Sequence, residues 1–197
     1  MIIDNNTTLN IFASRYLDTV SISELIEWVD DPDPKVRTLV ARKLQCRGTR
    51  EVFEFAKQWA ISTLDYQREL AAFILGQLGC LFDDDKKYPF KSETKPILMS
   101  LINDENHEVR AAVIAGFGHL YNDLDNDIEK AVLNYANDKN EEVRIAVALT
   151  LGGSSGNQKV REVYSQYLEE DNEVSEWAEV GLEILEERLA NDPPTIM

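Results

Sequence analysis

Hydrophobic residues recur along this chain at the spacing of helix faces. The segment Ser21–Val29 is one example. Its apolar positions Ile22, Leu25 and Val29 fall on one side of a helix. Alternation of the strand type is hard to find, so the pattern predicts an all-α protein. The same helical spacing recurs over five further segments: Thr8–Leu17, Thr49–Ile61, Ser92–Ile102, Asn126–Ala136 and Asn157–Leu168.

Between these segments lies a second series of apolar runs, each opened by the same short pattern. The stretches NDENHEVRAA, NDKNEEVRIA and DDPDPKVRTL join an acidic turn to a valine, an arginine and an apolar helix. Aligned on the arginine, the runs stand at intervals of 31, 42, 34 and 31 residues. A period in this range indicates a solenoid of stacked repeats. The aligned positions are Arg37, Arg68, Arg110, Arg144 and Ser175.

The one long interval contains a stretch that a regular repeat does not need. CLFDDDKKYPF, residues 80–90, is 11 residues of loop-like sequence, and without it the interval would be 31 residues. We therefore predict an insertion loop between the second and third repeats.

Two further positions keep their register relative to the arginine. Six residues earlier stands an acid or a serine, which would accept hydrogen bonds from the free N–H groups of the helix's first turn. Eight residues later a glycine recurs, which would let two backbones approach closely or would permit a left-handed helix end. The first set is Asp31, Ser62, Asp104, Asp138 and Glu169, and the second is Gln45, Gly76, Gly118 and Gly152.

Units with an aspartate six residues before the arginine and the motif V-R-x-A resemble HEAT repeats. Asp104–Ala112 and Asp138–Ala146 carry both features. The short spacing looks like that of the HEAT-like repeats also found in phycobilin lyases. The resemblance covers nearly the whole chain and implies an α-solenoid of about five HEAT-like helix-turn-helix repeats. It implies a single domain over residues 1–190, with the insertion loop at 80–90 and a C-terminal tail at 191–197.

The arginines have a structural interpretation in such a stack. Each would pair with the turn aspartate of its own or a neighbouring repeat, and a bidentate pair would fix the stacking angle. Two units depart from the pattern, because Gln67 replaces the valine in the second and Ser175 replaces the arginine in the fifth. The expected ladder comprises Asp31, Arg37, Arg68, Asp104, Arg110, Asp138 and Arg144.

The chain carries a strong negative charge, with 36 acidic and 20 basic residues and a net charge of −16. Its apolar fraction of 44% is typical of a globular protein. Nucleic acids and anionic membranes bind basic surfaces, so neither is an expected partner. A basic protein is expected instead, since attraction would speed the encounter. Solubility alone is the plainer explanation of the charge.

No motif in the sequence indicates catalysis. There is no G-x-S-x-G, no P-loop and no G-x-G-x-x-G after a strand. The two histidines, His107 and His119, are not spaced as metal ligands, so we expect no catalytic residue, no metal and no cofactor. Cys46 and Cys80 have no metal or redox spacing, which favours a reducing compartment. The first ten residues lack signal-peptide features and no apolar run reaches about 20 residues, so we expect a cytoplasmic protein.

Two acidic segments are candidate partner-binding surfaces. Near the C-terminus, glutamates three or four positions apart would form a ridge along one helix, with Trp177 and Ile184 on its other side. A terminal repeat needs a polar outer face, but so dense an excess of one sign also suits a basic partner. The insertion would present aspartates and aromatic anchors, or would be a tolerated surface loop. The candidates are Glu173, Glu176, Glu179, Glu183 and Glu187 in the first segment and Asp83, Asp84, Asp85, Tyr88 and Phe90 in the second.

These features favour a non-catalytic protein that binds another protein. Its acidity suits a basic partner such as the nuclease domain of a bacterial toxin, whose nucleic-acid groove the carboxylates would cover, as in an immunity protein or antitoxin. An assembly scaffold or adaptor is the main alternative, and its apolar contacts would tolerate salt. HEAT-like DNA glycosylases need a basic groove, for which this chain offers little. Bilin absorbance would reveal a HEAT-like phycobilin lyase.

Overall fold

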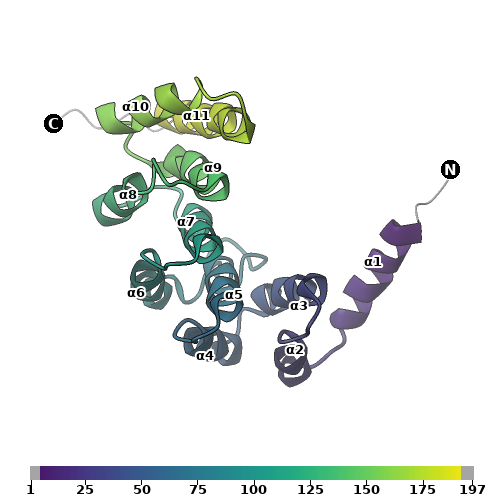
Figure 1. Cartoon of the computed structure of the whole chain (residues 1–197). Coiled ribbons are helices and arrows are strands. Elements are labelled where there is room, and N and C mark those ends of the chain that lie inside the picture. Colours follow the sequence, from purple (N-terminus) through teal and green to yellow (C-terminus); the bar gives the residue numbers. More distant parts are fainter. Residues whose placement is uncertain (1–4, 192–197) are drawn as a thin grey trace.

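The helices of this protein come in consecutive pairs (Figure 1). The structure is a computed structural model that describes residues 5–191, with side chains from residue 11 onward. The helices of this range are α1 Asn5–Leu17, α2 Ile22–Trp28, α3 Pro34–Arg47, α4 Arg50–Trp59, α5 Asp65–Gly76, α6 Lys91–Leu101, α7 His107–Leu120, α8 Asn126–Leu133, α9 Glu141–Thr150, the 3-10 helix η1 Leu151–Gly153, α10 Gln158–Tyr167 and α11 Glu173–Asn191. Residues 192–197 of the predicted tail lie outside the described residues.

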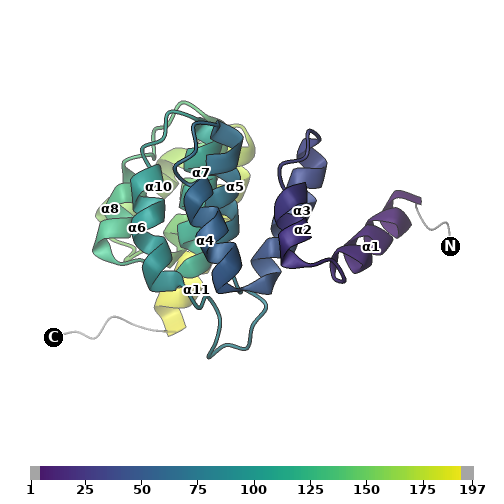
Figure 2. The same ribbon diagram turned by 90° about the horizontal axis from the view of Figure 1, so that it is seen from below.

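The pairs stack into a curved solenoid of two layers. α3, α5, α7, α9 and α11 line the inner side of the curve, and α2, α4, α6, α8 and α10 form the outer layer (Figure 1). α1 precedes the first pair and extends away from it. The connection between α5 and α6, residues 77–90, projects from one edge of the stack (Figure 2). The chain is an α-solenoid, so the predicted fold is confirmed.

The core is an apolar layer between the inner and outer helices. Three residues after each ladder position, the inner helix contributes a side chain that is at most 1% exposed. Leu25, Phe53, Leu98, Ile128 and Tyr164 meet this row from the outer helices and are equally buried. Burial of each large side chain contributes about 1.5–3 kcal/mol. The row from the inner helices is Val40, Ala71, Val113, Val147 and Ala178.

The recurring acid or serine shapes the turn and does not cap the helix directly, which corrects the sequence-based expectation. Asp104 Oδ1 accepts from the backbone N–H of Asn106 at 3.0 Å, and Asn106 is the residue that caps α7. Asp31, Ser62 and Asp138 make the same bond two residues onward. The local reason is that a short polar side chain readily bonds to the backbone two positions ahead in a turn.

The recurring glycine permits close approach of neighbouring inner helices. A Cβ at Gly76 would lie 2.6 Å from the Cα of Gly116, and one at Gly152 would lie 2.9 Å from Ile184 Cγ2. These glycines are not among the residues with positive φ, which are Gly48, Gly79, Gly156 and Tyr88. Of the two roles predicted for the glycine, close approach is therefore the one observed.

The last repeat should be sensitive to one added methyl group. A Cβ at Gly181 would lie 2.2 Å from the carbonyl oxygen of Ala148 and 2.9 Å from the Tyr164 hydroxyl. We expect Gly181→Ala to lower the free energy of unfolding by about 1–3 kcal/mol through overpacking, against the ordinary helix preference for alanine. Urea denaturation followed by circular dichroism measures the change. Ser165→Ala, at an exposed position of α10, is the control, and a Gly181→Ala protein as stable as the wild type would contradict the close approach.

Candidate functional site

The ladder arginines connect consecutive turns of the solenoid. Arg110 Nη1 donates to the backbone carbonyl of Asp104 at 2.8 Å, while its Nε and Nη2 donate to Asp138 Oδ2 at 3.0 and 2.7 Å. Arg68 repeats the arrangement, bonding to the carbonyl of Ser62 and to both carboxylate oxygens of Asp104. Each guanidinium thus ties its own turn to the turn of the following repeat.

The two ends of the ladder differ from its middle. Arg144 donates to Glu170 at 2.9 Å, one residue beyond the register position Glu169. Arg37 has no carboxylate partner within the described residues, because Ser62 stands where the next turn would supply an acid. Its guanidinium lies over the ring of Tyr66 at 4.6 Å from the centroid and bonds to the carbonyl of Asp31.

Burial and hydrogen bonding act in opposite directions on the ladder carboxylates. Burial alone would raise the pKa of Asp138, but bonds from the Asn140 backbone N–H and from Arg110 outweigh it and hold the pKa below its ordinary value. Burial likewise opposes a low pKa at Asp104, where Arg68 and the Asn106 N–H prevail. Both carboxyl groups are therefore ionised at neutral pH and serve as structural anions.

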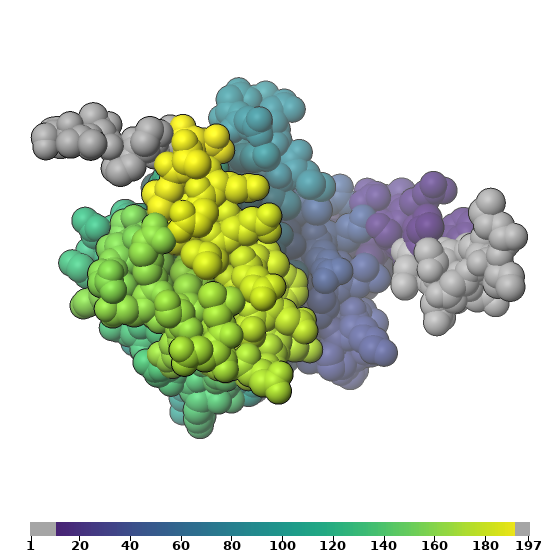
Figure 3. Space-filling view, turned by 90° about the horizontal axis from the view of Figure 1, so that it is seen from above, coloured from purple at the N-terminus to yellow at the C-terminus, as the bar shows by residue number. Residues whose placement is uncertain are grey.

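The acidic ridge lies on the last inner helix, α11, at the end of the stack (Figure 3). All five predicted glutamates, Glu173, Glu176, Glu179, Glu183 and Glu187, are exposed. Their neighbours Glu170 and Glu186 pair with arginines, whereas no ion pair within the described residues uses any of the five. The ridge therefore presents a group of carboxylates without counter-charges on the protein's own described surface.

The equivalent positions in the preceding repeat show which face of α11 two of these glutamates occupy. Glu179 takes the position that is Ala148 in the preceding repeat, and Ala148 contacts α11. Glu183 takes the position of Gly152, which also packs on α11. In every earlier repeat these two positions face the repeat that follows. Glu179 and Glu183 hence cover the face on which a sixth repeat would stack, and their charges oppose such stacking.

An apolar strip borders the ridge, and the sequence analysis did not foresee it. Trp177 and Ile184, expected on the side of α11 away from the acids, are 41% and 45% exposed, and Val180 between them is 40% exposed. The register of these residues places them on the inner, concave side of the solenoid. We call Trp177, Val180 and Ile184 the apolar strip. Counting positions from the ladder residue shows which side of an inner helix each residue occupies, and this count could have predicted the apolar strip from the sequence.

The insertion loop divides into an exposed acidic part and a packed aromatic part. Asp83, Asp84 and Asp85 are exposed, and Lys87 pairs with Asp84 at 2.7 Å. Phe90 packs on Phe53 with ring centroids 4.9 Å apart, and Tyr88 is also partly buried against the core. Phe90 and Tyr88, which the sequence offered as candidate anchors for a partner, thus pack against the body of the protein where the loop meets α6.

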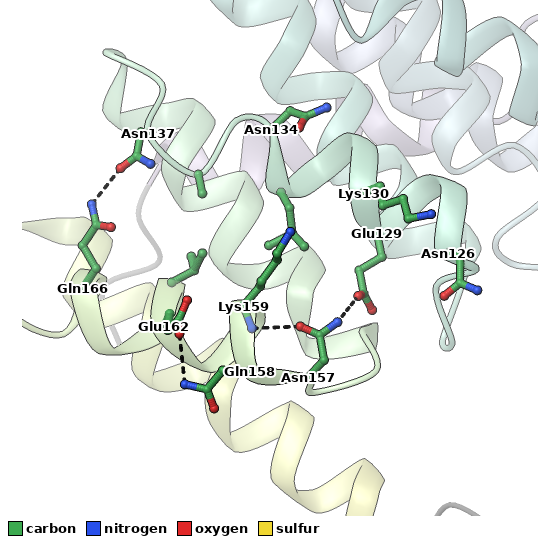
Figure 4. A pocket seen from close by; sticks show the side chains of 13 residues that line it. Asn126, Glu129, Lys130, Asn134, Asn137, Asn157, Gln158, Lys159, Glu162 and Gln166 are labelled. Atoms are coloured by element: carbon green, nitrogen blue, oxygen red, sulfur yellow. Dashed lines mark hydrogen bonds between the residues drawn. The ribbon is translucent and has the colours of Figure 1, made fainter.

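A groove on the outer layer runs between α8 and α10 (Figure 4). Its volume is about 790 Å³, and its walls carry mostly amide and charged side chains. Glu129 accepts from Asn157 Nδ2 and from the backbone N–H of Ser155, both at 2.6 Å, and so fastens α8 to the loop before α10. Because these polar groups bond to one another within the protein, we interpret the groove as a structural contact between α8 and the loop before α10.

The described residues show no obvious centre for metal chemistry. Among them, no group of three or more His, Cys, Asp and Glu side chains could hold a metal ion. His107 Nε2 lies 3.0 Å from Glu142, and His119 stands near the end of α7. A search of the described helices for one long and apolar enough to cross a membrane finds none.

Comparison with known proteins supports a HEAT-like repeat protein. Residues 94–183, from α6 into α11, match the family model described as HEAT repeats. No curated protein matches the chain. The X-ray structure of the Escherichia coli protein YibA aligns with 98% of this chain and 81% of its own, at 19% identity and a TM-score of 0.55. A designed armadillo repeat protein aligns with 83% of this chain and 82% of its own, at 14% identity and a TM-score of 0.50. Both structural likenesses concern the fold.

Loss of one ladder carboxylate should be costly. The Arg110 and Asp138 side chains are 10% and 8% exposed, so Asp138→Ala leaves a buried guanidinium without its partner. We expect a loss of about 3 kcal/mol in the free energy of unfolding, measured by urea denaturation. Glu93→Ala is the matched control, because Glu93 also pairs with an arginine, Arg50, but at an exposed site, and we expect little change. Equal effects of the two variants would contradict a special role for the ladder.

The contribution of Asp138 should also depend on pH. Its folded pKa is depressed, so its stabilisation is complete above the ordinary carboxyl pKa of 3.8 and disappears as the pH falls through the lower folded value. We expect the difference in unfolding free energy between wild type and Asp138→Ala to stay constant from pH 7 to about pH 4 and to shrink below. Urea titrations at pH 7, 5, 4 and 3 test this, and a difference that persists undiminished at the lowest pH would count against it.

Proposed function

We propose that this chain is a non-catalytic binding protein whose partner is a basic protein, held at the acidic end of the solenoid. The observation that carries the proposal is the exposed ridge on α11, where Glu173, Glu176, Glu179, Glu183 and Glu187 lack ion-pair partners within the described residues. A solenoid is suited to this task because its repeats hold a large surface rigid while contacting only their neighbours.

Electrostatics supports a basic partner over other classes. The net charge of −16 disfavours binding of nucleic acids and anionic membranes, which associate with basic surfaces. Unpaired carboxylates grouped on one helix attract lysines and arginines over about one Debye length, which is about 8 Å at physiological ionic strength. Such attraction raises the association rate and makes it sensitive to salt.

A more specific form of this proposal is that the basic partner is a nuclease. An enzyme that binds nucleic acid has a groove lined by basic side chains, and a helix carrying successive glutamates would occupy that groove in place of phosphates. This would make the chain an inhibitor such as the immunity protein of a bacterial toxin. The support for this form is the charge and the helical presentation of the acids.

A scaffold or adaptor is the second candidate, and a separate observation favours it. The apolar strip Trp177, Val180 and Ile184 exposes large hydrophobic side chains on the concave side. Such a group of exposed apolar residues is typical of a protein-binding surface. Contacts made there would tolerate salt, in contrast to those of the ridge.

The proposal is tested by capturing partners of the tagged full chain from extracts of its native cell, at low and at high salt. We expect one basic protein in stoichiometric amount, retained poorly at high salt. Reversing three ridge charges in Glu176→Lys, Glu179→Lys and Glu183→Lys should abolish its capture, because attraction becomes repulsion.

The control reverses the same number of charges elsewhere, in Glu27→Lys, Glu105→Lys and Glu162→Lys, which are exposed on other parts of the surface. This variant has the same net charge as the ridge variant and should still capture the partner. Loss of capture in both variants would mean that net charge alone acts. Loss of capture only when Asp83, Asp84 and Asp85 are reversed would move the site to the insertion loop. An acidic partner, or none, would refute the proposal.

A further inference from the structure

The concave side of the last three repeats is apolar across several helices. In α11 the exposed residues there are Trp177, Val180 and Ile184. At the corresponding positions α9 and η1 carry the buried Ala146 and the partly buried Leu149 and Gly153. On α7 these positions are the partly buried Ala112 and Ala115 and the exposed His119. At the position just before that of Trp177, the partly buried Ile145 on α9 and Ala111 on α7 are also apolar, whereas α11 has Glu176 there.

The apolar side chains on this surface are smallest on α7. Small alanines lie over α7 in the middle, and they form the floor of a shallow depression between Phe73 on α5 and His119. Larger side chains follow on α9 and α11, ending at Trp177. We call this concave surface the trough, with the alanines of α7 as its floor and the apolar strip of α11 as its wall. The ridge glutamates Glu176, Glu183 and Glu187 follow the strip along α11.

We infer that this trough binds a basic amphipathic α-helix of the partner protein, an inference that rests on the proposed function and assigns the part of the partner that makes the contact. The apolar stripe of such a helix would lie against the apolar strip and the α7 floor. Its lysine or arginine side chains would reach the ridge.

A helix fits this surface better than an extended segment for a reason of hydrogen bonding. An extended peptide must satisfy its backbone N–H and C=O groups from outside, and the trough exposes almost no side chain that could do so. A helix satisfies these groups internally and presents side chains only. Neighbouring inner helices lie about 8–10 Å apart at such contacts, which suits a guest helix about 10 Å across.

Charge complementarity determines which charge the bound helix must carry. Glu173 and Glu176 stand at the start of α11 and Glu187 near its end, so acids border the apolar strip along most of the helix. A helix with acidic flanks would be repelled, and one with neutral flanks would leave these acids without counter-charges. The guest is therefore both apolar on one face and basic beside it.

The test uses three synthetic 18-residue peptides and the full chain, with binding followed by fluorescence anisotropy of the labelled peptide. The first peptide places leucines on one helix face and lysines elsewhere, the second has the same composition in an order without a leucine face, and the third replaces lysine by glutamate. We expect the first to bind about tenfold or more tightly than the second, and the third not to bind.

Substitutions in the protein locate the binding site. Trp177→Ser and Val180→Ser should each weaken binding of the first peptide about tenfold, because each removes a large apolar contact at the wall. Ile61→Ser is the matched control, since Ile61 is 86% exposed but lies on the turn after α4, and it should change nothing. Circular dichroism melting curves verify that all three variants fold.

Several results would overturn the inference. Equal binding of the first two peptides would mean that charge alone acts, and unchanged binding by both strip variants would place the helix elsewhere. A dimer in sedimentation analysis that Val180→Ser dissociates would show that a second copy of the chain covers the trough. If the peptides fail but capture of a basic protein still depends on the ridge, this inference is wrong and the proposed function stands. If ridge-dependent capture itself fails, the proposed function is wrong.

Discussion

The link between consecutive turns made by Arg68, Arg110 and Arg144 is the constraint on which the rest of the structure depends. Arg68 and Arg110 each hold a carbonyl of their own turn and a carboxylate of the following turn. The planar guanidinium makes both contacts in one fixed orientation, so it sets the angle between repeats. With that angle fixed, the inner helices come close enough for Gly76 and Gly116 to touch backbone to backbone. The ladder bonds and this close helix packing together hold the repeats in a curved stack.

The proposed binding surface arises where this repeating scheme stops. The second and fourth repeats present small residues to their successors, Ala72 and Gly76 to α7 and Ala148 and Gly152 to α11. In α11 the same positions are Glu179 and Glu183, which end the stack. On the concave side of the same helix, the large apolar residues Trp177 and Ile184 are exposed. Acids and exposed apolar residues thus stand together on the last inner helix of the described residues.

Much of the fold could be predicted from the sequence because the determining signals are local and repeated. An arginine after a valine, with an acid six residues earlier, specifies the same turn each time it occurs. The partner of Arg37 could not be predicted in this way, since it is the ring of Tyr66, which belongs to no repeated motif. The sequence left open whether Tyr88 and Phe90 anchor a partner or belong to a tolerated surface loop, and only the tertiary contact with Phe53 shows that Phe90 packs inward. Periodicity also could not separate Trp177 from the buried Val174, because both lie on the apolar side of one helix. What separates them is which neighbour each side chain meets, because Val174 packs in the core whereas Trp177 lies on the concave side.

The measurement that tests the central claim most directly is zero-length crosslinking of carboxylates to lysines, applied to the complex of the full chain with its captured partner and read by mass spectrometry. The account predicts crosslinks from partner lysines to glutamates within α11, from Glu173 to Glu187, with the partner lysines spaced three or four residues apart as on one face of a helix. Crosslinks confined to the outer layer, such as Glu162 beside the groove between α8 and α10, would contradict it.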